Sequence, residues 1–176
     1  MDLYLSWTIS YGKRSGYDTL HRHYEQSEAI SLEGGKDMAV ETKEITLQSR
    51  GNCDTIDITS QVARNVEKSG INNGTVTLFI VGSTAGITTI EYEPNLLSDF
   101  KGMWDKVIPQ NIPYQHDRTW GDGNGHSHVR ASMLGPSLTV PFVNKRLTLG
   151  TWQQIVFVDF DNRPRSRKIV IQILGE

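Results

Sequence analysis

The sequence predicts an α+β protein with a largely antiparallel sheet system and two or three helices. Three observations predict this class. Strand-like segments occur in both halves of the chain, and two segments between them have helical periodicity. The chain also lacks the glycine-rich phosphate motifs that join strand to helix in parallel α/β proteins. A length of 176 residues suits one domain.

Residues 1–37 differ from the rest of the chain because their aromatic and polar residues follow no sustained period. We expect an N-terminal extension here, either upstream of a true start at Met38 or poorly ordered, followed by a single domain over residues 38–176. The extension holds four basic and six acidic residues, so the body is formally neutral. His21 and His23 resemble a metal pair, but an isolated pair in such a segment is more simply solvated.

The first half of the body alternates between strand and helix signals. Residues 43–49 and 55–59 alternate apolar and polar side chains and predict half-buried strands. Residues 59–70 predict a short helix with Thr59 or Ser60 as N-cap and Gly70 as its stop. The β-branched run 75–82 predicts a central strand, and 87–93 is its expected partner across a short turn.

The second half begins with a predicted helix over residues 94–109, with Pro94 in its first turn. Its apolar residues have helical spacing and are expected in the core: Leu96, Leu97, Phe100, Met103, Trp104 and Val107. After a polar segment, four strand-like segments follow, over residues 137–142, 146–150, 151–160 and 167–174.

Composition excludes several classes of protein. No apolar run is long enough to cross a bilayer, and no secretory signal precedes the body, which predicts a soluble cytoplasmic protein without a membrane partner. A net charge of -2 gives no reason to expect nucleic acid. Cys53, the only cysteine, is a candidate nucleophile, but no basic residue or histidine stands beside it, so a small structural residue is the better interpretation.

The polar segment 114–135 holds three of the five histidines, and it raises the question of a metal or catalytic site. His116, His126 and His128 could supply the three protein ligands typical of catalytic zinc. If 126–128 is extended, His126 and His128 project to one face; on a helix they diverge by about 200°. Ser127 is a possible cap of a helix that would hold His128 and leave His126 outside. The alternative is a glycine-rich surface loop with polar histidines.

Two stretches identify a family. The segment "YQHDRTWGDGNGHSHVRASMLGPSLTVPF" and the later "RLTLGTWQQIVFVDFDNRPRSRKIVIQILGE" closely resemble the YjbQ-like family, often labelled secondary thiamine-phosphate synthase. The resemblance covers Met38 to the C-terminus, and its "SMLG" and "LGTWQ" signatures are specific. It implies a mixed, largely antiparallel β-sandwich that assembles as a homotrimer with clefts near subunit boundaries.

The resemblance also implies a polar cluster built from "YQHD", "HSHVR", the "STAG" turn and the acidic "IEYEP". By position, His116, His128 and Glu91 match the family's catalytic residues, and His126 would be a further metal ligand. The chain departs from the family at residue 82, where relatives often carry histidine and this sequence has Gly82.

The implied activity joins a pyrimidine methyl diphosphate to a thiazole phosphate with release of pyrophosphate, as a main or a side activity. Because both substrates are anionic, Arg118 and Arg130 are candidate phosphate-binding residues. A divalent metal ion, zinc first and magnesium or manganese as alternatives, would stabilise the leaving group. Two alternatives stay open: a metal-dependent hydrolase of a phosphorylated or heterocyclic small molecule with Glu91 or His128 as base, and a non-enzymatic trimeric metabolite-binding protein.

Overall fold

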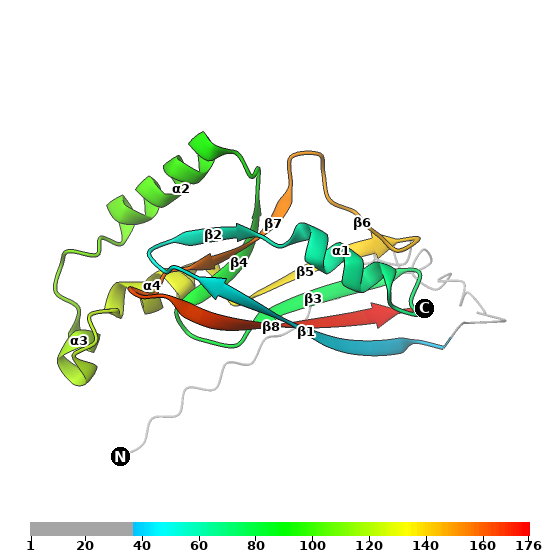
Figure 1. Cartoon of the computed structure of the whole chain (residues 1–176), viewed down its shortest axis with the longest axis horizontal. Helices are drawn as coiled ribbons and strands as arrows, with labels where there is room; N and C mark the ends of the chain where they lie inside the picture. Colours follow the sequence, from blue (N-terminus) through cyan, green and yellow to red (C-terminus); the bar gives the residue numbers. More distant parts are fainter. Residues whose placement is uncertain (1–36) are drawn as a thin grey trace, which may run out of the picture. The chain divides into compact units, whose positions relative to one another are not determined.

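The computed structural model describes residues 37–176, which belong to one compact unit built from two antiparallel sheets and four helices (Figure 1). The predicted N-terminal extension, with His21 and His23, lies outside the described residues except for Asp37. The larger sheet has the strand order β1 (Ala39–Ser49), β8 (Arg165–Gly175), β3 (Gly74–Ile80), β5 (Ser137–Val143) and β6 (Arg146–Leu147). The smaller has the order β2 (Asp54–Asp57), β7 (Gln154–Asp159) and β4 (Ala85–Ile90).

The helices are α1 (Thr59–Glu67), α2 (Pro94–Val107), α3 (Gln115–Trp120) and α4 (Gly125–Leu134). The α+β class with antiparallel strands is therefore confirmed. The described residues form four helices where two or three were predicted, and α3 is the helix that was not predicted. Helix α1 begins where it was expected, but neither Thr59 nor Ser60 caps it through its side chain. Instead the Asp57 carboxylate accepts a hydrogen bond of 2.8 Å from the Thr59 N–H.

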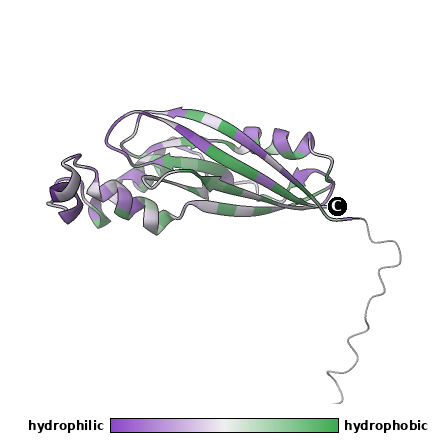
Figure 2. Cartoon of the chain, turned by 90° about the horizontal axis from the view of Figure 1, so that it is seen from below, coloured by the Kyte–Doolittle hydropathy of each residue, from purple (hydrophilic) through white to green (hydrophobic). Residues whose placement is uncertain are grey.

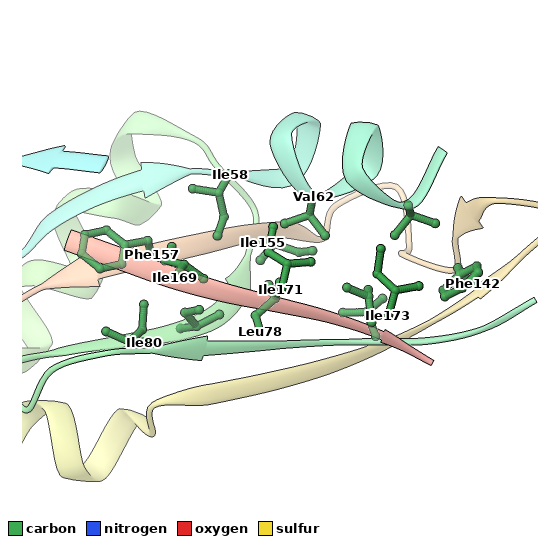
Figure 3. Packing of buried hydrophobic residues seen from close by; sticks show 14 of the residues in the cluster. Ile58, Val62, Leu78, Ile80, Phe142, Ile155, Phe157, Ile169, Ile171 and Ile173 are labelled. Atoms are coloured by element: carbon green, nitrogen blue, oxygen red, sulfur yellow. The ribbon is translucent and has the colours of Figure 1, made fainter. Parts of the chain in front are cut away.

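The main core lies between the two sheets and under α1 (Figure 3). Strands β3 and β8 bury every second side chain, as a sheet with one packed face requires. Val62 and Val66 of α1 are fully buried against the same cluster, as their helical spacing predicts. Burying each such side chain contributes about 1.5–3 kcal/mol. The labelled members of this cluster are Ile58, Val62, Leu78, Ile80, Phe142, Ile155, Phe157, Ile169, Ile171 and Ile173.

The expected pairing of β3 with β4 is wrong. Strand β3 pairs with β5 and β8, whereas β4 pairs with β7 in the other sheet. The turn over residues 81–84 therefore carries the chain from one sheet to the other instead of closing a hairpin. An apolar run identifies a buried strand but does not identify its neighbours, which is why the sequence suggested the nearer partner.

A second, smaller core lies where α2 and α4 meet β7. Trp104 of α2 packs edge to face against Phe100 and Phe160, with ring centroids 5.8 and 5.0 Å apart. Of the six apolar α2 residues expected in the core, Trp104 alone is buried; Met103 and Val107 are 40% and 57% exposed. Figure 2 shows hydrophobic residues concentrated along the strands, whereas the helices at both ends of the view carry many hydrophilic residues.

Candidate functional site

Glycines and one aspartate bring α3 and α4 together. Helix α3 ends at Gly121, whose φ of 69° is the left-handed conformation that favours glycine. Helix α4 begins at Gly125, whose N–H donates to the Asp117 carboxylate at 2.9 Å. A Cβ at Gly125 would lie only 2.4 Å from the Cβ of Tyr114, so this close approach of the two segments requires glycine.

This arrangement places His116 of α3 beside His128 of α4, with ring centroids 4.4 Å apart. Asp122, in the loop between the helices, has its Oδ1 atom 3.9 Å from Nε2 of His116. Burial and the neighbouring His116 lower the pKa of His128 below its ordinary value. The His128 imidazole is therefore largely neutral at pH 7, the form that ligates metal ions and accepts protons.

His126 does not join this pair. Helix α4 starts at Gly125, three residues earlier than a Ser127 cap would allow, so His126 and His128 both lie in its first turn. Residues two apart on a helix diverge by about 200°, so the two imidazoles cannot bind one ion. His126 is 3% exposed and packs beside Tyr114, with Nε2 3.2 Å from the Ser127 hydroxyl. The geometry thus contradicts His126 as a ligand shared with His128.

The two candidate phosphate-binding arginines have different surroundings. Arg118 lies on α3 with an exposed side chain. Arg130 of α4 is fully buried and donates from Nε and Nη2 to the Ile108 carbonyl at 2.9 and 2.6 Å. Its Nη2 also donates to the Asp105 carboxylate at 2.9 Å. Arg130 therefore fixes the end of α2 against α4, and the expectation that it contacts phosphate is wrong for this geometry.

Glu91 lies away from the histidine pair. It follows the last residue of β4, whereas Ala85 at the start of β4 lines a pocket with His128. Six residues of extended chain span roughly 20 Å. Of the four segments expected to form one polar cluster, three meet at the α4 end of the fold and the acidic "IEYEP" does not.

The pocket beside His128 has a volume of about 350 Å³, and the "STAG" turn forms one wall. The first turns of α4 and the start of β5 complete it. Ser83 and Ser132 bring hydroxyl groups to this pocket, and the sequence interpretation assigned no role to either. The residues lining it are Gly82, Ser83, Ala85, His128, Ala131, Ser132 and Pro136.

A buried ion cluster, formed by Asp159, Asp161, Arg165 and Arg167, lies behind the same turn. Nε and Nη2 of Arg167 each donate to the Asp159 carboxylate at 2.8 Å, and Nη2 also donates to the Thr84 hydroxyl at 2.7 Å. Asp161 accepts hydrogen bonds from Thr84 at 3.0 Å and from Arg165 at 2.8 Å. None of these four residues was predicted from the sequence to belong to a site. The signal for the ion cluster was the "DFD" and "RSR" pairs at the adjoining ends of β7 and β8.

These contacts favour the charged forms of Asp161 and Arg167. Burial raises the pKa of Asp161, but hydrogen bonds from Arg165 and Thr84 outweigh burial, and the pKa lies below its ordinary value. Burial lowers the pKa of Arg167, but its bonds and ion pairs with Asp159 and Asp161 raise it above the ordinary value. The four groups balance in charge and hold one another in fixed orientations.

Other candidate sites are weaker. Within residues 37–176, no group of three or more His, Cys, Asp or Glu side chains has an arrangement that could hold a metal ion, so these residues offer the pair His116 and His128, with Asp122 nearby. Burial raises the pKa of the Cys53 thiol to about 11, which supports its interpretation as a structural residue. Over the same residues, none of the helices has the length and apolar character needed to cross a bilayer.

Known proteins similar to this chain match nearly all of residues 38–176. The family model described as UPF0047 protein YjbQ-like matches residues 43–176. A UPF0047 protein of Methanothermobacter thermautotrophicus is 41% identical over 139 residues, which cover 79% of this chain and 95% of the relative. The UPF0047 protein YugU of Bacillus subtilis is 34% identical, over 76% of this chain and 98% of the relative.

Solved structures agree with the fold. The crystal structure of a YbjQ-like protein of unknown function from Sulfolobus solfataricus matches with a TM-score of 0.76 and 34% identity, over 80% of this chain and all of that one. A hypothetical protein from Aeropyrum pernix matches with a TM-score of 0.72 and 31% identity, over 77% of this chain and 99% of that one.

Proposed function

We propose that this chain, which belongs to the UPF0047 protein YjbQ-like family, is a metal-assisted enzyme that acts on a small phosphorylated substrate. One observation carries the proposal: two helices bring the rings of His116 and His128 to a centroid distance of 4.4 Å, and His128 also lines a pocket of about 350 Å³. Paired imidazoles beside a concave pocket are a common setting for metal or acid–base chemistry.

The residues at this site fit a divalent cation in part. His116 and His128 would bind it through imidazole nitrogens, and Asp122, whose Oδ1 is 3.9 Å from Nε2 of His116, would orient His116. The described residues supply no third protein ligand, so water or substrate would fill the other positions. Two imidazoles favour zinc, while magnesium and manganese, which prefer oxygen ligands, remain the alternatives. A bound cation would supply Lewis-acid stabilisation of phosphate charge.

The first candidate reaction is transfer, with thiamine-phosphate synthase activity as a main or a side activity. The pyrimidine methyl diphosphate loses pyrophosphate, and the thiazole nitrogen forms the new bond to the methylene carbon. In this scheme the exposed Arg118 binds phosphate oxygens, and the neutral His128 holds the substrate at the pocket mouth through a hydrogen bond. Glu91 and Arg130 have no part in it, because Glu91 lies beyond the far end of β4 and Arg130 is buried with its bonds to Ile108 and Asp105.

The second candidate is a metal-dependent hydrolase of a phosphorylated or heterocyclic small molecule. The pocket size favours it, since about 350 Å³ is at the low end for ligand sites and suits one small substrate better than two. His128 would be the general base only in a form of the site in which it does not ligate the cation, because a neutral imidazole has one nitrogen that can either bind metal or accept a proton from water.

The deciding experiment measures bound metal by elemental mass spectrometry in the full chain and in three histidine variants. We expect near-stoichiometric metal in the wild type, a loss of at least tenfold in His116→Ala and His128→Ala, and retention in His126→Gln, the matched control. Production of pyrophosphate only when both thiamine precursors are present identifies the transferase, and turnover of one substrate with water identifies the hydrolase.

If His116→Ala and His128→Ala leave metal content and every detected activity unchanged, the site assignment is wrong. Saturable binding of an anionic metabolite without metal or turnover would instead support the third candidate, a non-enzymatic binding protein.

We also propose a cytoplasmic homotrimer without nucleic-acid or membrane partners. The outer face of the larger sheet supports self-association, because Phe79, Val143 and Leu174 are 47%, 53% and 41% exposed on strands whose opposite face is the core.

A further inference from the structure

Arg167 has a guanidinium group that its partners use only in part. Its Nε and Nη2 atoms make all of its hydrogen bonds to Asp159, Asp161 and Thr84. Within residues 37–176, Nη1 makes no hydrogen bond. A guanidinium carries five N–H donors, so the two on Nη1 are left for solvent or a ligand.

Gly82 leaves Nη1 accessible. Gly82 is exposed, and a Cβ built on it would lie 3.2 Å from Nη1 of Arg167, so any side chain at this position would cover that end of the guanidinium. The φ of 155° at Gly82 is also one that other residues rarely adopt. Because residue 82 is glycine, a small ligand can contact Nη1 of Arg167; a side chain at this position would block that contact.

Gly82 also lines the pocket that His128 and the two serines share. Arg167 is not among the residues that line this pocket; its Nη1 lies next to Gly82, 3.2 Å from where a Cβ would stand, so a ligand would reach it past the bare glycine backbone. Further donors stand there. Ser83 and Ser132 have hydroxyl groups in the lining, and the N–H groups of Gly82 and Ser83 donate to no acceptor within the described residues. The Ser132 hydroxyl donates to the Val129 carbonyl at 2.8 Å and would have to rotate away from it to donate to an anion. A fixed guanidinium beside hydroxyl and amide donors is the chemistry that binds a phosphate oxyanion.

We propose that Gly82, Ser83, Ser132 and Arg167 form a phosphate-binding subsite of this pocket, which takes the terminal phosphate of a small phosphorylated substrate. The inference deepens the proposed function and rests on it, because it names where the substrate's anionic group binds. Asp159 and Asp161 hold the guanidinium in place and reduce its net charge, so free phosphate binds weakly, in the millimolar range, and specificity comes from orientation.

The test is a titration of metal-free full chain with inorganic phosphate, followed by calorimetry or by ³¹P line width. We expect saturable binding by the wild type, at least tenfold weaker binding by Gly82→Ala and Arg167→Lys, and wild-type binding by Gly102→Ala. Gly102 is the matched control, because a Cβ there meets nothing within 4 Å and Gly102 lies on α2.

Melting temperatures separate a lost subsite from a lost fold. If Gly82→Ala and Arg167→Lys unfold, Ser132→Ala decides, since its exposed hydroxyl makes a single hydrogen bond to Val129 and its loss should weaken binding severalfold. No saturable binding by the wild type, or wild-type affinity in the folded variants, overturns the subsite.

His116→Ala distinguishes this inference from the proposed function. The His116→Ala variant should no longer take up metal when metal is added. Its metal-free form should bind phosphate as tightly as the metal-free wild type. If it loses phosphate binding, the anion binds at the histidine pair and the subsite is wrong. If the wild type takes up no metal but binds phosphate through Gly82 and Arg167, the subsite stands and the metal-assisted enzyme fails.

Discussion

The imidazole of His126 is buried in α4 beside the charged guanidinium of Arg130. Burial and Arg130 lower the pKa of His126, and the more distant carboxylates of Asp117, Asp161 and Asp105 offset this only in part. The folded protein therefore holds His126 neutral at a pH where the unfolded chain, with a pKa of about 6.5, already binds a proton.

This difference predicts how stability depends on pH. The unfolded state binds more protons than the folded state between the lowered pKa of folded His126 and the unfolded value of about 6.5. The free energy of unfolding therefore decreases as the pH falls through this range and increases as the pH rises through it. We expect the melting temperature of the wild type to fall more between pH 7.5 and 5.5 than that of His126→Gln, by several degrees. Thermal unfolding at both pH values checks this; equal slopes in the two proteins would contradict it. The lowered pKa of His128 makes stability depend on pH in the same direction, but His128 is present in both the wild type and His126→Gln, so its effect cancels when the two are compared.

Residues of the site differ in how far the sequence could predict them. His116 and His128 could be predicted because both lie in one glycine-rich segment, so local chain turns suffice to bring them together. Arg167 could not, because its bond to Thr84 joins residues 83 positions apart and depends on how β7, β8 and the 81–84 turn meet. His126 was grouped with His128 because the sequence leaves open whether residues 126–128 are extended or helical, and the structure makes them helical from Gly125.

At the scale of elements, local sequence signals predicted where helices and strands lie better than they predicted which strands pair with each other. Alternation located β1 and β8, and Pro94 located the start of α2, because both signals act within a few residues. The partners of β3 could not be predicted, since its hydrophobic run suits any central position in either sheet. Helix α3 was missed because six residues with one exposed tryptophan carry no amphipathic period.

The start of α2 supplies an element-scale prediction that separates two neighbouring acids. Glu93 is the N-cap, and its carboxylate accepts hydrogen bonds from the N–H groups of Asn95 and Leu96 at 2.8 and 2.9 Å. Glu91 is exposed and its carboxylate makes no hydrogen bond to a described residue. We expect Glu93→Ala to lower the melting temperature by on the order of 2–4 °C, because two N–H groups lose their acceptor.

Glu91→Ala is the matched control, and calorimetry should find its melting temperature unchanged. The same pair tests catalysis. Neither variant should alter the activity assigned to the His128 pocket, and a large loss of activity in Glu91→Ala alone would restore Glu91 to the active site.

At the scale of the whole molecule, the larger sheet has one packed face and one open face. On the open face Phe79 of β3 stands opposite Val170 of β8, and Thr77 stands opposite Gln172. Charged residues are few there, and Lys168 is paired with Glu44 at 2.8 Å. A broad face of threonine, glutamine and apolar side chains is typical of a surface covered by a partner, and the homotrimer proposed above would provide one.

We therefore expect the full chain to sediment at three times its mass of 19.8 kDa, and Phe79→Lys to sediment as a monomer. A lysine there would place an unpaired charge in the centre of an apolar contact, which self-association cannot tolerate. Val107→Lys is the control, because Val107 is 57% exposed on α2, away from the larger sheet. Analytical ultracentrifugation gives the answer directly. A monomeric wild type would refute the trimer, and a trimer that survives Phe79→Lys but dissociates in Val107→Lys would move the interface to the helical end, beside the histidine pair.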